Sequence, residues 1–153
     1  MKYFLMCMLY IAALGVLSFV AGSLVPKRWF HADRFPWRCR PSEQKLWKLL
    51  RVKKWQAKVP DMSRIFPKLM PAKKMTKENF DNLPRMLEET CVAECTHALL
   101  SVLGLAMLKI WPGAGGILIT VIYIALGNLP FIIIQRYNRP RLQKLLMMQQ
   151  RKR

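Results

Sequence analysis

The sequence predicts an all-α membrane protein with about three transmembrane helices and a cytoplasmic amphipathic helix that lies at the membrane interface. Two observations carry this prediction. Hydrophobic residues make up 53% of the 153 residues, and the chain nevertheless carries 26 Lys and Arg against 8 Asp and Glu. Soluble domains seldom combine these extremes, whereas a small membrane protein with basic cytoplasmic segments does so naturally. We therefore expect a single multi-pass domain over residues 1–153 in the cell membrane.

The net charge and the cysteines narrow the possible class of protein and its ligands further. A net charge of +18 also suits a nucleic-acid-binding protein, but the long apolar runs and the lack of a zinc-finger or RNA-binding motif argue against nucleic acid. Anionic membrane lipid or a phosphate-bearing ligand accounts for the charge more economically. The four cysteines show no disulfide framework, so we expect free thiols.

The first predicted transmembrane helix covers residues 3–25, which are apolar apart from two serines and a few glycines. This length spans roughly 30 Å of hydrocarbon at 1.5 Å per residue. A cleaved signal peptide is the alternative, but its apolar core is about 7 to 15 residues long and follows more positive charge than Lys2 provides. We expect the helix to be retained.

A basic loop follows at residues 26–83 and is predicted to be cytoplasmic. Residues 26–85 contain 17 Lys and Arg against 5 Asp and Glu, which by the positive-inside rule places them inside and the N-terminus outside. Within the loop, Ser42 is expected to cap a helix that runs to about Lys58. Its apolar face, formed by Leu46, Leu49 and Leu50, suits a helix lying on the cytoplasmic leaflet.

Two further apolar stretches predict a transmembrane hairpin. A helix is expected over residues 84–110, a turn over the proline- and glycine-rich residues 111–116, and a second helix over residues 117–135. The tail, residues 136–153, carries seven Lys and Arg and no acidic residue, so it too is expected inside.

The hairpin fixes which residues of its two arms lie at the same depth. Equal rise on both arms pairs residue i with about residue 227 − i, so His97 lies level with about Pro130 and Glu94 with about Ile133. Ionisable groups on a membrane helix are functional candidates by default. The polar residues that this register brings towards Glu94 and His97 are Asn128, Gln135 and Arg136.

Glu94 and His97 are the predicted catalytic pair. They are three residues apart and share one helix face, and a carboxylate beside an imidazole orients the ring and favours its action as a general base. The alternative is a buried ion pair with Arg136 that only holds the hairpin together. No metal site is expected, because the cysteines at 91 and 95 do not converge with His97 on one face. A cysteine nucleophile is weaker still, because neither thiol lies three or four residues from His97.

The start of the tail, residues 135–142, reads Gln-Arg-Tyr-Asn-Arg-Pro-Arg-Leu. It sets three guanidinium groups at the predicted water interface, a geometry suited to phosphates or carboxylates. The alternative is a positive-inside anchor for the helix. Asn128 and Pro130, inside the preceding apolar run, are costly at bilayer depth unless neighbouring helices satisfy them.

These motifs resemble the glycosyl-4,4'-diaponeurosporenoate acyltransferase family. The resemblance covers roughly residues 26–145 and rests on Glu89-Thr90-x-x-Ala93-Glu94-x-x-His97, Asn128-x-Pro130, Lys53-x-Trp55 with Lys58, and above all the string at 135–142. Members of this family are small membrane enzymes that esterify the sugar of a carotenoid glycoside with a fatty acid, the last step towards staphyloxanthin-type pigments.

The resemblance implies a membrane acyltransferase with a lipid glycoside as acceptor and a fatty acyl donor. It implies no cofactor. The acyl donor, such as acyl-CoA, is a co-substrate. His97 and Glu94 are the implied catalytic residues. The implied substrate-binding residues are Lys53, Trp55, Glu89, Asn128, Gln135, Arg136, Tyr137, Asn138, Arg139 and Arg141. The competing function is a non-catalytic membrane adaptor that binds anionic lipid or a partner protein, but an adaptor has no use for polar groups at matched depth in the hairpin.

The charge asymmetry makes the topology testable. In a cysteine-free background, a cysteine at Gly113 is expected to react with a membrane-impermeant reagent added from outside, whereas one at Met70 is not. Outside labelling at Met70 would reverse the topology and move the proposed site to the other face of the membrane.

Overall fold

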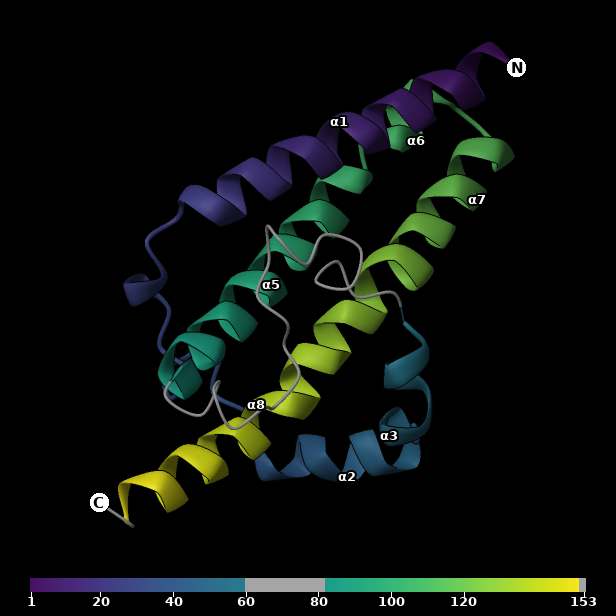
Figure 1. Cartoon of the computed structure of the whole chain (residues 1–153). Coiled ribbons are helices and arrows are strands. Elements are labelled where there is room, and N and C mark those ends of the chain that lie inside the picture. The colour runs from purple at the N-terminus through teal and green to yellow at the C-terminus, as the bar shows by residue number, and fades with distance from the viewer. Residues whose placement is uncertain (60–81, 152–153) are drawn as a thin grey trace. The chain divides into compact units, whose positions relative to one another are not determined.

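The computed structural model describes residues 1–59 and 82–151, and within them every regular element is helical (Figure 1). The all-α fold class is confirmed. Three helices of the described chain are long and apolar enough to cross a membrane: Lys2–Leu24, Leu83–Ile110 and Ala114–Gln150. Residues 60–81 of the predicted basic loop, with the labelling position at Met70, lie outside the described residues.

The chain divides into two compact units. The first contains Met1–Pro26 and Val92–Ile132, and the second contains Lys27–Cys91 and Ile133–Arg153, so the helical stretches Leu83–Ile110 and Ala114–Gln150 contribute to both. In chain order the elements are α1 (Lys2–Leu24), η1 (Lys27–Trp29), α2 (Pro41–Leu49), α3 (Val52–Trp55), η2 (Gln56–Lys58), α5 (Leu83–Gly104), α6 (Met107–Ile110), α7 (Ala114–Ile122), η4 (Tyr123–Asn128) and α8 (Leu129–Gln150).

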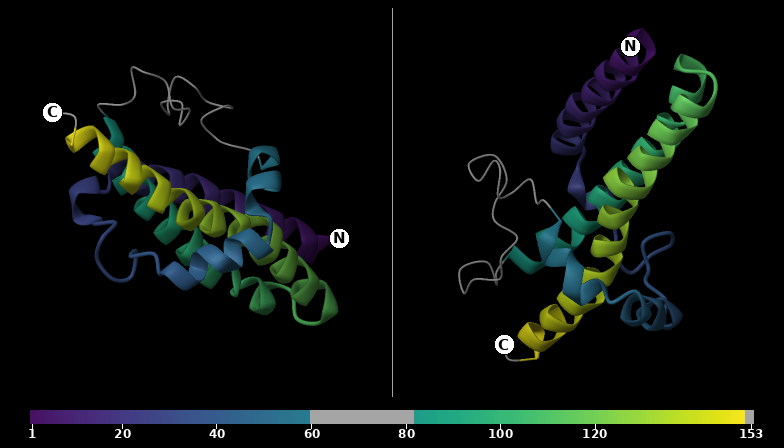
Figure 2. Two further views of the ribbon diagram at one scale, coloured as in Figure 1. Left: turned by 90° about the horizontal axis from the view of Figure 1, so that it is seen from below. Right: turned by 90° about the vertical axis from the view of Figure 1, so that its right-hand side faces the viewer.

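The first unit is built on the predicted hairpin, whose arms run antiparallel (Figure 2). Gly113 adopts a φ of 101°, a conformation that favours glycine, and α7 starts directly after it. A Cβ at Gly116 would collide with the carbonyl oxygen of Trp111, so the turn also needs a small residue there. A turn at this place is confirmed, although its last three predicted residues, 114–116, belong to α7.

Two contacts hold the arms and α1 together. The ring of Tyr123 covers Gly104, where an added Cβ would lie 2.7 Å from the ring. At the end of α5 the backbone tightens, and Ala106 N–H donates to the carbonyl of Leu103 at 3.1 Å. The hydroxyl of Tyr10 on α1 donates to the same carbonyl at 2.9 Å, which ties α1 to this bend.

The returning arm contains a π-helical turn, η4, directly before Pro130. Leu129 N–H donates to the carbonyl of Ile124, five residues back instead of four. Proline lacks an N–H, and its ring clashes with the carbonyl four residues earlier in an α-helix, here that of Leu126. The wider turn relieves this clash and lets the helix continue through the proline.

The amphipathic segment of the second unit differs from the predicted single helix. α2 begins at Pro41, not after a Ser42 cap, because proline suits the first helical position and Glu43 Oε1 accepts the N–H of Arg40 at 3.2 Å. The prediction of one helix to Lys58 is wrong, because Arg51 adopts a left-handed φ of 51° and ends the first helix. Trp55 Nε1 donates to the carbonyl of Leu50 at 3.0 Å, so this carbonyl at the break between the two helices has a hydrogen-bond partner. The predicted leucine stripe is exposed.

The core of the second unit lies where the first turns of α5 meet α8. Leu83, Leu87 and Leu142 are its buried members. Ala32 packs against them, and its carbonyl accepts a hydrogen bond from Gln143 Nε2 at 3.3 Å. This core fixes the segment after η1 beside α8, which positions the arginine contacts described below.

The close approach at Gly104 generates a stability prediction. Gly104→Ala forces the Tyr123 ring to move, and overpacking of this kind costs about 1–3 kcal/mol. Thermal unfolding in detergent is expected to show a lower Tm. Gly15→Ala is the matched control, because a Cβ there meets nothing within 4 Å and alanine favours the helix. Equal Tm values for the two variants would contradict the tight contact.

Candidate functional site

His97 is held on two sides within the first unit. Its Nδ1 lies 3.0 Å from Asn128 Oδ1, and Asn128 Nδ2 donates to the carbonyl of Tyr123 at 3.0 Å. The imidazole stacks on Phe131 with ring centroids 4.6 Å apart and planes inclined by 9°. Asn128 is only 1% exposed. Ring position and ring plane are thus both fixed by the returning helix.

The predicted hairpin register is confirmed at His97. Its partners, Asn128 and Phe131, lie on either side of the position that equal rise assigns, about residue 130. Glu94 is buried on α5, three residues before His97 and on the same face of the helix. Gln135 and Arg136 belong to the second unit, so their predicted pairing with Glu94 stays a prediction.

This arrangement can move a proton. A neutral imidazole carries one N–H and one lone pair, so it can accept the proton of a hydroxyl that attacks a carbonyl. The stack and the hydrogen bond restrict ring rotation, so the ring is already oriented for the reaction. Ser101 Oγ donates to the backbone carbonyl of His97 at 2.8 Å, which anchors the main chain without touching the ring.

The cysteines and acids near this site do not assemble into a metal centre. Within residues 1–59 and 82–151, no group of three or more His, Cys, Asp and Glu is placed to hold a metal ion. Cys91 is buried and Cys95 is exposed, so the two thiols of α5 occupy different environments.

Arg139 is buried within the second unit. Its guanidinium is 0% exposed and donates to Thr90 Oγ1 at 2.9 Å, to the Thr90 carbonyl at 3.0 Å and to the Trp37 carbonyl at 2.6 Å. The expectation that all three arginines of the string at 135–142 face the water interface is therefore wrong for Arg139. The physical reason is that these acceptors, two of them main-chain carbonyls, draw the fork inwards.

Arg136 forms a two-pronged ion pair with Glu43 of α2. Its Nε lies 2.9 Å from Glu43 Oε2, and its Nη2 lies 3.3 Å from Oε1. Pro140, inside α8, has no N–H for the carbonyl of Arg136, and the thiol of Cys39 donates to that carbonyl at 3.5 Å. The segment from Cys39 to Glu43 therefore serves both the side chain and the backbone of Arg136.

The remaining predicted binding residues are dispersed in the second unit. Arg141 is exposed and its guanidinium lies over the ring of Tyr137, 4.0 Å from the centroid, with a hydrogen bond to the hydroxyl. Glu89 accepts from Lys27 at 2.8 Å and pairs with Arg85 at 3.3 Å. The others are Gln135, buried; Asn138 and Trp55, half-buried; and Lys53, exposed.

Sequence reasoning assigned no role to four residues of these two clusters. The contact of Phe131 with His97 could have been predicted, because the hairpin register places Phe131 one position from the level of His97. Glu43 and Trp37 gave no comparable signal, and Thr90 stood in the motif at residues 89–97 without a role, because their contacts with the arginines join segments between 49 and 102 positions apart in the chain.

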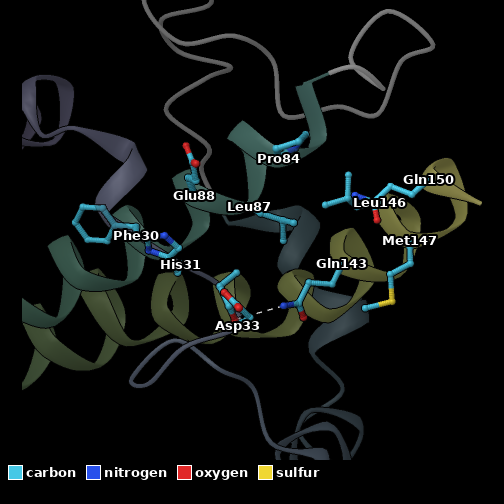
Figure 3. Close-up of a pocket in the computed structure, with 11 residues that line it drawn as sticks. Phe30, His31, Asp33, Pro84, Leu87, Glu88, Gln143, Leu146, Met147 and Gln150 are labelled. Atoms are coloured by element: carbon cyan, nitrogen blue, oxygen red, sulfur yellow. Dashed lines mark hydrogen bonds between the residues drawn. The ribbon is translucent and has the colours of Figure 1, made fainter. Parts of the chain in front are cut away.

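A cavity of about 310 Å³ opens elsewhere in the second unit (Figure 3). Figure 3 shows side chains of α5 and α8 and of the segment after η1 around it. Neither Asp33 nor Glu88, its two carboxylates, forms an ion pair within the described chain. No predicted site residue lines it. Its lining is Phe30, His31, Ala32, Asp33, Pro84, Leu87, Glu88, Gln143, Leu146, Met147 and Gln150.

Comparison with protein families matches residues 26–148 to the family described as glycosyl-4,4'-diaponeurosporenoate acyltransferase. The chain belongs to this family. Its relatives include the glycosyl-4,4'-diaponeurosporenoate acyltransferases of Staphylococcus aureus strains MRSA252 and Newman, which are 30% and 31% identical to it over 134 residues. Each alignment covers 86% of this chain and 80% of the relative. No solved structure matches the chain.

The chain is thus a member of an acyltransferase family with three helices fit to span a membrane. The family match covers both candidate clusters, the one around His97 and the one around Arg136 and Arg139. It also includes the predicted motif string at residues 135–142.

In this member of the acyltransferase family, Arg139 is buried and Arg141 is exposed, so we expect their substitutions to differ in their effect on stability. Arg139→Lys keeps the charge but cannot reach all three acceptors, and each buried group left unsatisfied costs about 1–3 kcal/mol. Its Tm in detergent is expected to fall. Arg141→Lys changes an exposed side chain and is expected to alter stability by no more than about 0.5 kcal/mol. Equal loss in both variants would contradict this assignment.

Proposed function

We propose that this protein is a membrane acyltransferase that esterifies a sugar hydroxyl of a lipid glycoside, with His97 as general base. The observation that carries the proposal is an imidazole fixed by Asn128 and Phe131 between two apolar helices. Family membership supplies the reaction class. The names of the relatives point to a carotenoid glycoside as the acceptor and so support this substrate class for the present chain.

The reaction needs one proton transfer and no covalent enzyme intermediate. His97 takes the proton from the sugar hydroxyl as its oxygen attacks the carbonyl of an acyl thioester. The tetrahedral intermediate then collapses, the C–S bond breaks, and the leaving thiolate takes the proton from the imidazolium. The products are the sugar ester and a free thiol. A thioester is already activated, so a cysteine nucleophile adds nothing to this scheme.

We assign Glu94 as the charge partner of the imidazolium. It is buried on the same face of α5 as His97, and a carboxylate stabilises a cation that forms nearby. The negative charge that develops on the carbonyl oxygen needs a hydrogen-bond donor. Glu94→Gln is expected to lower kcat, and an unchanged kcat would remove this residue from the mechanism.

Among the arginines, Arg141 is our candidate for binding the phosphates of the acyl donor. Its exposure and its support by Tyr137 leave the guanidinium accessible, whereas Arg139 is enclosed by protein acceptors. The Arg141→Lys variant described above also tests this role. A raised donor KM with an unchanged Tm supports the assignment, and unchanged donor kinetics contradict it.

Replacement of His97 tests the proposed function directly. General-base assistance is worth roughly 10² to 10⁴ in rate, so His97→Ala is expected to lower kcat by that order. The measurement is release of free thiol by purified protein in detergent with acyl-CoA and a lipid glycoside. Cys91→Ala and Cys95→Ala are the controls and are expected to retain activity. A fully active His97→Ala protein, or a cysteine variant that is equally inactive, would refute the mechanism.

A further inference from the structure

We infer that Asn128 is a positioning residue that fixes the tautomer of His97, and that the π-helical turn η4 presents it in the required register. The inference deepens the proposed function and rests on it, because the tautomer matters only if the ring acts as a base. Asn128 was expected from the sequence to bind substrate. At 1% exposure its amide offers a substrate no accessible surface, while both of its ends are engaged by protein groups.

The direction of each hydrogen bond follows from the Tyr123 carbonyl. A carbonyl only accepts, so the atom of Asn128 that lies 3.0 Å from it must be the amide nitrogen. The amide oxygen then faces His97 Nδ1 at 3.0 Å. The reversed amide would set two oxygens against each other. Nδ1 of a neutral His97 therefore carries the proton, and the basic lone pair lies on Nε2.

The same helix face also fixes the ring plane. Phe131 lies three residues after Asn128 and stacks on the imidazole at 4.6 Å. The hydrogen bond decides which nitrogen is protonated, and the stack decides how the ring is turned. A base that needs neither rotation nor tautomer exchange before the reaction saves the cost of both.

The π-helical turn explains why Asn128 can reach His97 at all. On α5, His97 and Gly104 are seven residues apart, about two turns, and so share a face. Their contacts on the returning helix, Asn128 and Tyr123, are five residues apart. In an α-helix of 3.6 residues per turn, such residues point about 140° apart. In a π-helical turn, residues i and i+5 are bonded neighbours, so both face α5.

The tautomer is directly measurable, because the chain has only two histidines. His31→Gln leaves His97 alone, and ¹⁵N-histidine NMR of that protein in detergent distinguishes a proton on Nδ1 from one on Nε2. We expect Nδ1–H for the neutral ring. Asn128→Leu removes the acceptor and is expected to move the proton towards Nε2. Asn128→Asp keeps an acceptor oxygen and is expected to retain Nδ1–H.

Ser101→Ala is the matched control. It removes a hydrogen bond to the His97 main-chain carbonyl without touching the ring, so the Nδ1–H signal is expected to persist. Deletion of Ala125 tests the register, because one residue fewer leaves Tyr123 and Asn128 four residues apart in an α-helix, about 40° from each other, so that both still face α5. The Nδ1–H signal is expected to persist in the deletion variant. A folded deletion variant that loses the signal would refute the role of the π-helical turn.

The kinetic readout separates positioning from substrate binding. Asn128→Leu is expected to lower kcat roughly ten- to a hundredfold, part of the 10² to 10⁴ of the base, with little change in the acceptor KM. Asn128→Asp is expected to recover part of the loss. A raised acceptor KM at constant kcat would make Asn128 a binding residue and overturn the inference.

The failure of this inference is distinguishable from the failure of the proposed function. Nε2–H in the Asn128-containing protein, or an unchanged tautomer in Asn128→Leu, overturns the inference whatever the activity. If His97→Ala is inactive while Asn128→Leu keeps full kcat, His97 remains the base and Asn128 loses its role. If His97→Ala is fully active, the proposed function itself fails.

Discussion

Two prolines in one long apolar helix set the conditions for the rest of the structure. Pro130 and Pro140 both interrupt the hydrogen bonds of the helix that runs from Ala114 to Gln150. An unsatisfied backbone group costs several kcal/mol in hydrocarbon, where Pro130 is predicted, and about 1–3 kcal/mol when buried in protein, so both interruptions need a local solution. The first proline is preceded by a π-helical turn, and at the second the Cys39 thiol donates to the Arg136 carbonyl.

Each of these solutions also builds a cluster of polar side chains. The π-helical turn faces Asn128 towards His97 and Tyr123 towards Gly104. In the second unit, the segment that brings Cys39 to α8 also supplies Glu43 to Arg136. The contact of His97 with Asn128 and the ion pair of Arg136 with Glu43 therefore lie where the backbone accommodates a proline.

Some cations of the chain bind other protein groups, and others are exposed. Arg139 donates hydrogen bonds to protein acceptors, and Arg136 forms an ion pair with Glu43. These contacts together hold separate segments of the second unit in place. The cations of α2, α3 and η2 are exposed beside the exposed leucine stripe. That combination of apolar and basic side chains suits an anionic membrane surface.

The sequence by itself determined the helical class, the three long apolar helices, the turn after Trp111 and the meeting of His97 with Asn128. These follow from local rules, namely apolar length, proline and glycine placement, and a constant helical rise. Only the tertiary structure decided the π-helical turn, the break at Arg51 and the burial of Arg139. The physical reason is that an arginine fork selects among acceptors far away in the chain, and that Pro130 marks an interruption of the helix without fixing whether a π-helical turn or a kink accommodates it. Neither choice leaves a periodic signal in the residues nearby.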